Sequence, residues 1–236
     1  MYAIVLAGGK GERLRPFTED RPKPMVEIMG TPILAYQIAW LGAQGVTDVV
    51  ISCGYRHNVI MDFFGTGERL GVHIRYVVEE EALGRGGALR LALESVPKGE
   101  DAVLATNGDV LTNLRLAPLL EAHRAREVLA TVVLAPLVSQ YGIVEVDAGD
   151  RVTSFREKPE LPYWINAGIY VLSPAVRDFL PERGDHEVTT LPALAQAGRL
   201  SAFRSRTYWR TVDTIKDLNE VASELQQRLL SLFRGG

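Results

Sequence analysis

YAIVLAGGKGERLRPFTEDRPKPM, at positions 2–25, is the segment of the chain that says most about its fold. Residues 2–7 are a short apolar run that predicts a buried β-strand, and Gly8, Gly9 and Gly11 follow it directly. Because glycine lacks a Cβ, such a turn lets backbone N–H groups approach a polyphosphate closely. The spacing G-G-x-G matches neither the G-x-G-x-x-G dinucleotide fingerprint nor a P-loop, which needs G-K-[ST]. Taken alone, the glycines fit a phosphate-binding loop or a plain tight turn.

The segment RPKPM at 21–25 places Lys23 between two prolines. Proline fixes its own φ and restricts the residue before it, so the lysine stem is held on a stiff loop. A solvated lysine in a proline-rich turn is the alternative interpretation. Beside a glycine loop, a stiffly held cation is suited to binding phosphate.

Apolar runs alternate with helical patterns over the first half of the chain, which is typical of βαβ units and a mainly parallel sheet. After residue 127 the sequence predicts strands without long helices between them, and hence mixed or antiparallel pairing. The expected strands are 2–7, 49–52, 73–78, 102–106, 128–135, 141–147, 151–158, 164–172 and 200–205. We therefore predict an α/β fold, a Rossmann-like three-layer sandwich with a mixed, mainly parallel central sheet and a substrate-binding insertion.

The bounds of two helices can be read directly from the sequence. Thr31 followed by Pro32 predicts an N-cap and the first position of a helix that ends at Gly45. The last helix is expected from about Asp213 to Leu232. No stretch has the composition of a linker, so we expect a single domain over residues 1–236.

The composition is that of an ordinary globular chain, with 236 residues, 47% hydrophobic and 23% charged, and a formal charge of -3. These values exclude disorder and fibrous repeats. A mildly acidic chain without a basic block is poorly suited to nucleic acid or an anionic membrane, because both need clustered cations. Cys53 is the one cysteine, and we find neither a signal peptide nor an apolar run of about 20 residues. We expect a cytoplasmic protein that binds a small molecule.

Four further strings complete a recognisable set: LGRGGALRLAL at 83–93, NGDV at 107–110, FREKP at 155–159 and NAGIYVL at 166–172. With LAGGKGERLRPFTEDRPKPM they resemble the sugar-1-phosphate nucleotidylyltransferases, over roughly residues 1–214. The resemblance implies transfer of a nucleotidyl group from a nucleoside triphosphate to a sugar 1-phosphate, with Mg²⁺ as cofactor. It also implies a nucleotide-binding half at about 1–127, a sugar-phosphate-binding half at about 128–212 and a C-terminal helix at 213–236.

The resemblance assigns roles to individual residues. Arg13, Lys23 and Asp109 would be catalytic, with Arg13 holding the departing pyrophosphate and Lys23 between the α-phosphate and the sugar phosphate. Nucleotide binding is expected of Leu6, Ala7, Gly8, Gly9, Gly11, Gly84 and Gly87. Sugar-phosphate binding is expected of Gly142, Glu157, Lys158, Asn166 and Gly168. Arg85 departs from the small residue of the family's L-G-T-x-G string.

Two carboxylates are expected to hold Mg²⁺. Asp109 follows a predicted strand, at the end where open α/β sheets bind ligands. Many family members read W-x-D-[IV]-G-T near the end, whereas this chain reads WRTVDT at 209–214, so an ungapped match puts Thr211 where the aspartate belongs. The form W-x-x-x-D-T is similar to that of the glucose-1-phosphate cytidylyltransferases and favours Asp213 as the second ligand. The alternative for Asp213 is the N-cap of the last helix, and the two roles are compatible.

The sequence leaves the substrate pair open. LGRGGALR and NAGIYVL favour guanylyl transfer to mannose or heptose 1-phosphate, while PKPMVEI and WRTVDT favour the cytidylyl type. Thymidylyl and uridylyl transfer to glucose 1-phosphate also stay open, as does a non-catalytic homologue that binds nucleotide sugars. We expect no C-terminal β-helix, no nucleic-acid or membrane partner, and leave a homo-oligomer open.

Overall fold

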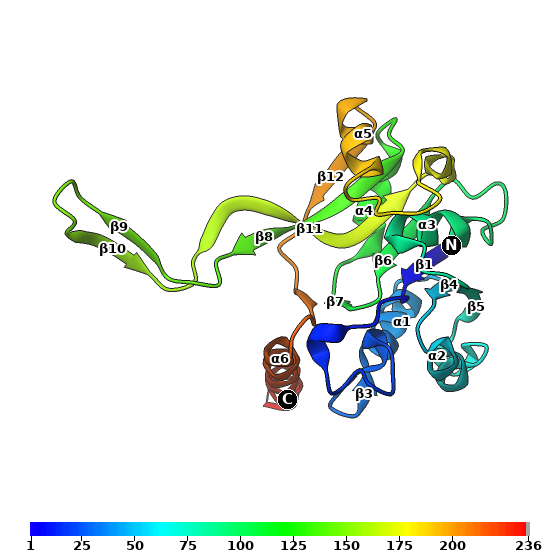
Figure 1. The fold of residues 1–236 in the computed structure, drawn as a ribbon, viewed down its shortest axis with the longest axis horizontal. Coiled ribbons are helices and arrows are strands. Elements are labelled where there is room, and N and C mark those ends of the chain that lie inside the picture. Colours follow the sequence, from blue (N-terminus) through cyan, green and yellow to red (C-terminus); the bar gives the residue numbers. More distant parts are fainter. Residues whose placement is uncertain (235–236) are drawn as a thin grey trace.

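The structure is a computed structural model that describes the backbone of residues 1–234 and the side chains of residues 1–227. A seven-stranded sheet in the order β12-β8-β11-β6-β1-β4-β5 forms its centre (Figure 1). The sheet comprises β1 Tyr2–Leu6, β4 Asp48–Cys53, β5 His73–Val78, β6 Val103–Asn107, β8 Ala130–Val138, β11 Glu160–Leu172 and β12 Leu200–Arg204. Three two-stranded pairs join β2 Glu27–Ile28 to β3 Thr31–Pro32, β7 Val110–Thr112 to β13 Trp209–Thr211, and β9 Ile143–Val146 to β10 Val152–Arg156.

Helices connect and cover these strands. The α-helices within the described residues are α1 Ile33–Ala43, α2 His57–Phe64, α3 Gly84–Leu93, α4 Leu116–Arg124, α5 Thr190–Gln196 and α6 Ile215–Arg234. Short 3₁₀ turns are η1 Glu12–Leu14, η2 Lys23–Met25, η3 Glu68–Leu70 and η4 Pro174–Phe179. Residues 235–236 of the predicted C-terminal helix lie outside the described residues.

The sheet is mixed and mainly parallel, as predicted. β1 runs parallel to both of its neighbours, β4 and β6, and β4 is parallel to β5. β11 is antiparallel to β6 and to β8, while β12 is parallel to β8. The antiparallel pairing expected for the second half of the chain is therefore confirmed in one central strand.

Side chains alternate between the two faces of the sheet and build two cores. In β1, Ala3 and Val5 pack into a cluster with α1, α2 and α4, whereas Tyr2 and Ile4 pack into a cluster with α3 and α5. Because a strand points successive side chains to opposite faces, a fully apolar strand requires a helical layer on each side. The predicted three-layer α/β sandwich is confirmed.

Strands from the second half of the chain complete the same sheet, but one hairpin leaves it. β9 and β10 project from the rest of the molecule in Figure 1. They pair antiparallel, with Phe155 opposite Val144 and Val152 opposite Val146. The predicted strands at 141–147 and 151–158 are thus the two arms of this hairpin.

One predicted helix boundary is wrong. Thr31 and Pro32 form β3, which pairs with β2, and α1 begins one residue later with Pro32 as its N-cap. The proline's fixed φ suits the last extended position as well as the first helical one. In the part of the chain that the structure describes, no helix has the length and apolarity to cross a membrane.

Candidate active site

The glycine-rich turn follows β1 at the carboxyl edge of the sheet. The side chain of Leu6 and the backbone of Gly8 and Gly9 line a cavity of about 390 Å³. Ala7 is buried and its N–H donates to the carbonyl of Ser52 in β4, at 2.7 Å, which anchors the turn to the sheet. The structure therefore places three of the predicted nucleotide residues on the cavity and Ala7 behind them.

Gly11 has a packing role instead of lining the cavity. Its φ is +69°, in the left-handed region, and a Cβ there would lie 2.7 Å from Cβ of Lys23. Thr18 donates a hydrogen bond of 2.9 Å to the Gly11 carbonyl. Both the backbone conformation and the close approach require glycine, and the approach brings the Lys23 loop against the glycine turn.

Lys23 is held where the sequence predicts it, on a stiff turn. It opens η2, with Pro22 as N-cap in extended conformation, and Met25 and Val26 are buried beside it. Its side chain is only 14% exposed. The ammonium nitrogen lies 2.5 Å from Oδ2 of Asp109 and 2.7 Å from Oδ1 of Asp213.

A third apolar cluster explains why four distant segments meet. It contains one buried neighbour of each charged residue: Leu14 follows Arg13, Val26 follows the Lys23 turn, Leu111 lies in β7 after Asp109, and Val212 precedes Asp213. β13 pairs with β7, which puts Thr211 opposite Val110. Packing of these side chains thus assembles the charged group at the sheet edge.

The Asp213 side chain is not used to cap α6, because other residues do so. Thr214 accepts a hydrogen bond from the Asp217 N–H at 3.2 Å, and Asp217 accepts one from the Thr214 N–H at 2.8 Å. This reciprocal arrangement is a capping box. The alternative in which Asp213 itself is the N-cap is therefore wrong. Thr211, the residue of the ungapped match, donates to Oδ2 of Asp213 at 3.3 Å and so supports it.

The charges around Asp213 favour its ionised form. Burial opposes ionisation of Asp213, but the hydrogen bond from Lys23 and the charges of Lys23 and Arg13 outweigh it and lower the pKa of this carboxyl below its usual value. Arg13 lies 2.8 Å from Oδ1 of Asp213 and is 73% exposed, so its guanidinium is accessible to a ligand.

The residues present fit a hard divalent cation. Asp109 keeps one buried carboxylate oxygen, Oδ1, without a hydrogen-bond partner among the described residues. Mg²⁺ is typically bound by one or two carboxylates together with phosphate oxygens, and keeps several waters. Groups of three or more His, Cys, Asp or Glu able to hold a metal do not occur in the described part of the chain. The paired carboxylates of Asp109 and Asp213 match the Mg²⁺ pattern and not that of a zinc site.

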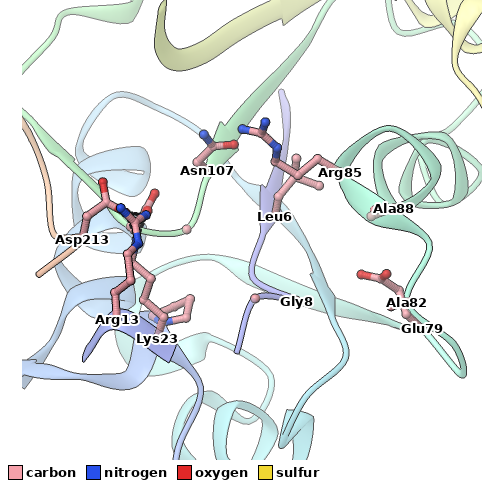
Figure 2. A pocket seen from close by; sticks show the side chains of 15 residues that line it. Leu6, Gly8, Arg13, Lys23, Glu79, Ala82, Arg85, Ala88, Asn107 and Asp213 are labelled. Atoms are coloured by element: carbon pink, nitrogen blue, oxygen red, sulfur yellow. Dashed lines mark hydrogen bonds and ion pairs between the residues drawn. The ribbon is translucent and has the colours of Figure 1, made fainter. Parts of the chain in front are cut away.

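The charged residues around Lys23 form one side of the cavity, and Arg85 of α3 lies on the other side (Figure 2). Figure 2 shows Arg13, Lys23 and Asp213 together, with the Arg85 guanidinium across the cavity, pointing toward Asn107. The full lining is Leu6, Gly8, Gly9, Arg13, Lys23, Pro24, Glu79, Ala82, Gly84, Arg85, Ala88, Asn107, Gly108, Asp109 and Asp213. Arg13, Lys23 and Asp109 therefore share one cleft.

The start of α3, with the string LGRGGA at 83–88, is tightly packed against the segment before α5. A Cβ on Gly84 would lie 2.6 Å from the Gly184 carbonyl oxygen, and one on Gly87 would lie 2.4 Å from the Glu182 carbonyl oxygen. Gly84 lines the cavity, whereas Gly87 is buried against the neighbouring loop and is not among the lining residues. Close packing requires glycine at both positions, which the sequence pattern does not reveal.

The predicted sugar-phosphate residues lie outside the cavity lining. Gly142 and Glu157 face each other at the base of the hairpin, where a Gly142 Cβ would lie 3.0 Å from Oε2 of Glu157. Lys158 lines a neighbouring cleft with Thr211. Gly168 abuts Asn107, whose Nδ2 would be 2.6 Å from a Cβ at that position. Asn166 bonds to neighbouring protein groups described below.

The structure adds polar residues that no motif indicates. Gln37 of α1 is buried and donates to Oγ1 of Thr106 at 3.1 Å and to the Asn107 carbonyl at 2.8 Å, which holds the end of β6. Glu79 lines the cavity and accepts hydrogen bonds from Ser52 and from the Leu83 N–H. The bonds of Gln37 and the bond from Ser52 to Glu79 join segments far apart in sequence, so no local pattern could have found them.

Comparison with known proteins identifies the family. The profile of the family described as Nucleotidyl transferase matches residues 2–228. Similar curated proteins include the mannose-1-phosphate guanylyltransferase of Mycobacterium tuberculosis, 36% identical over 94% of this chain and 64% of that protein. The mannose-1-phosphate guanyltransferase of Yarrowia lipolytica is 37% identical, over 92% of this chain and 62% of that protein. The chain thus spans less than two thirds of the length of these relatives.

Solved structures agree with the sequence comparison. HddC from Yersinia pseudotuberculosis superimposes with a TM-score of 0.77 at 26% identity, covering 95% of this chain and 99% of that one. The same protein complexed with GMP-PN gives a TM-score of 0.76 at 25% identity with the same coverage. From the extent of the family match, this chain belongs to the nucleotidyl transferase family.

Proposed function

We propose that this chain transfers a nucleotidyl group from a nucleoside triphosphate to a sugar 1-phosphate. A phosphate oxygen of the sugar 1-phosphate attacks the α-phosphorus, the bond from that phosphorus to the oxygen bridging to the β-phosphate breaks, and pyrophosphate leaves. The observation that carries the proposal is the convergence of Arg13 and Lys23 on Asp109 and Asp213 at one cavity behind a glycine turn. Such a reaction needs alignment of two anions and neutralisation of developing charge.

Each group has a role in this reaction. The backbone of Gly8 and Gly9, which lines the cavity, cradles the triphosphate, and Arg13 holds the departing pyrophosphate through its planar donors. Lys23 neutralises the α-phosphate as the nucleophile approaches. Asp109 and Asp213 hold Mg²⁺, which when bound supplies positive charge to the phosphate oxygens.

The relatives favour a guanine nucleotide and mannose 1-phosphate as the substrate pair. Two similar curated proteins bear the name mannose-1-phosphate guanylyl- or guanyltransferase, and a similar fold has been solved with GMP-PN. Heptose 1-phosphate is the second sugar we propose, and transfer of other nucleotides to glucose 1-phosphate is the alternative. A reaction that consumes nucleoside triphosphates suits the cytoplasm, which is the location we propose.

A substrate matrix tests the proposal. Five nucleoside triphosphates are combined with the 1-phosphates of mannose, glucose, galactose and N-acetylglucosamine, and pyrophosphate release is measured with Mg²⁺ and with a chelator. We expect the fastest Mg²⁺-dependent release from GTP with mannose 1-phosphate. Nucleotide binding without release from any pair would contradict catalysis and favour a nucleotide-sugar-binding homologue.

Asp109→Asn tests the proposed metal site. The substitution keeps the shape of the side chain but removes the charge next to Lys23 and the anionic oxygen left without a partner. We expect turnover to fall by at least about 100-fold while circular dichroism is unchanged. A wild-type rate would remove Asp109 from the metal site.

A further inference from the structure

The carboxylate of Glu187 joins helix α3, which lines the cavity through Arg85, to strand β11 of the central sheet. It accepts hydrogen bonds from Arg85 of α3, at 2.8 Å to Oε1 and 2.7 Å to Oε2. Oε1 also accepts from Nδ2 of Asn166 at 3.0 Å and from the hydroxyl of Tyr170 at 2.9 Å, both in β11. Arg85 lines the cavity, and Asn166 belongs to the predicted sugar-binding set. One side chain therefore connects a residue of the cavity lining to a predicted sugar-binding residue outside that lining.

The backbone around Glu187 is fixed by its own contacts. The Gly86 N–H donates to the Gly184 carbonyl at 2.8 Å, and the Gly184 N–H donates to the Leu83 carbonyl at 2.8 Å. Asp185 accepts from the Glu187 N–H at 2.9 Å. These bonds, with the close glycine contacts described above, hold the carboxylate in place independently of any ligand.

The hydrogen bonds of Asn166 determine what it can offer a ligand. Both hydrogens of Nδ2 are engaged, by Glu187 and by the Tyr170 oxygen at 2.7 Å. Oδ1 accepts from the Gly168 N–H at 2.9 Å. An amide oxygen has two lone pairs, so a single acceptor position on Oδ1 is left. Asn166 can accept one hydrogen bond and cannot donate one.

Arg85 is neutralised by the same assembly. Besides Glu187 it pairs with Asp185, so that two carboxylates face one guanidinium. A cation already paired with two anions is a weak partner for phosphate. Its role is to hold Glu187 from the α3 side.

We propose that Glu187 is a positioning residue for sugar recognition, which fixes the amide of Asn166 so that Oδ1 accepts a hydrogen bond from a sugar hydroxyl. This proposal rests on the proposed function, because it assigns the open acceptor to the sugar 1-phosphate. It predicts that Glu187 acts on the sugar substrate through Asn166 and has little effect on the nucleoside triphosphate.

A double-mutant cycle tests the coupling. Wild type, Glu187→Gln, Asn166→Ala and the double variant are compared in steady-state pyrophosphate release, with the best substrate pair of the matrix. The glutamine amide puts an NH₂ donor in place of one of the two carboxylate oxygens. This NH₂ faces donors of either Arg85 or Asn166, and the negative charge that attracts both is lost. We expect Glu187→Gln to raise KM for the sugar 1-phosphate about tenfold, with kcat and KM for the nucleotide within about twofold.

The effect of Glu187→Gln in a protein that already carries Asn166→Ala shows whether Glu187 acts through Asn166. If Glu187 acts through Asn166, adding Glu187→Gln to Asn166→Ala changes KM for the sugar by less than about twofold. Effects that multiply would overturn the proposal. Asp101→Asn is the matched control, because it also replaces a carboxylate paired with an arginine, the exposed Arg124, but leaves the partners of Arg85 and Asn166, and we expect it to leave KM for the sugar unchanged.

A measurement without turnover separates this proposal from the proposed function. The chain has five asparagines, at 58, 107, 113, 166 and 219, so ¹⁵N-asparagine labelling gives a simple side-chain amide spectrum. We expect the Asn166 resonances, assigned by their loss in Asn166→Ala, to shift in Glu187→Gln but not in Asp101→Asn. Unshifted resonances would overturn the positioning role even in an active enzyme. A shift in a protein that turns over no pair would leave the contact standing while the function fails.

Discussion

Lys23 neutralises two carboxylates that would otherwise repel each other. Its ammonium contacts Asp109 and Asp213 in a partly buried position. Two carboxylates that face one cavity repel each other, and an ammonium in contact with both reduces that repulsion. The same charge is well placed to neutralise a phosphate once a metal ion takes over the carboxylates.

Replacement of Lys23 by methionine tests this second role. The substitution keeps the length of the stem but removes the charge, which acts most strongly in the transition state. We expect kcat to fall by about 100-fold with KM for either substrate changed much less. Steady-state kinetics measure kcat and KM separately. An effect confined to KM would contradict a role of Lys23 in the transition state.

Individual site residues differ in how far the sequence could predict them. Arg13, Lys23 and Asp109 lie in compact motifs, and the structure brings all three to one cleft. Asp213 required a choice against Thr211, and only the capping box shows that its side chain does not cap α6. Glu187 has no motif at all, because its contacts come from α3 and β11, far away in sequence.

The start of α6 is the element on which the position of Asp213 depends. Loss of the Thr214 hydroxyl removes the cap bond to the Asp217 N–H. We expect Thr214→Ala to lower the free energy of unfolding by about 1 kcal/mol and to weaken Mg²⁺ activation. Urea unfolding and a Mg²⁺ titration measure the two effects. Thr214→Ser keeps the hydroxyl, so an equal loss in that variant would contradict a capping cause.

The contact between the start of α3 and the segment before α5 allows a prediction about the stability of the protein. A Cβ at Gly87 would overlap the Glu182 carbonyl oxygen, which is backbone and cannot move away cheaply. We expect Gly87→Ala to lower the free energy of unfolding by about 1–3 kcal/mol, measured in urea. At Gly9 nothing lies within 4 Å of the place that a methyl group would take, so Gly9→Ala should change stability by less than about 0.5 kcal/mol. Equal losses of stability in Gly87→Ala and Gly9→Ala would contradict a role for the overlap with the Glu182 carbonyl oxygen.

Element prediction succeeded where a local pattern decides and failed where pairing decides. The apolar run at 2–7 and the helical spacing after residue 32 are local, and β1 and α1 follow them closely. The short strands β7 and β13 were not predicted, because each is only three residues long and exists through its partner. The same kind of pairing turned Thr31 from an expected cap into a strand residue.

For the protein as a whole, buried histidine makes stability depend on pH. His186 is 2% exposed, packs against the Tyr170 ring, and neither of its ring nitrogens has a hydrogen-bond partner among the described residues. Burial lowers the pKa of His186 below its usual value of 6.5, and the nearby Arg85 acts in the same direction, against the opposing charges of Glu187 and Asp185. The unfolded chain therefore binds more protons than the folded one as the pH falls below about 6.5.

The expected result is a loss of stability in mild acid. The free energy of unfolding should decrease from about pH 7.5 to about pH 5.5, and the decrease should be smaller in His186→Leu, which removes the titrating group. His123, whose pKa burial also lowers, stays in both proteins and sets the remaining slope. Urea unfolding at several pH values provides the measurement, and parallel curves for the two proteins would exclude His186 as a cause.

The position of β11 affects synthesis of the chain. β11 fills the place between β6 and β8, although both of those strands precede it in sequence. Until it has left the ribosome, the nascent protein presents two open strand edges whose backbone groups can pair with another polypeptide. The risk of aggregation is therefore greatest in the interval between the emergence of β8 and that of β11, and a chaperone that protects this intermediate has to act there.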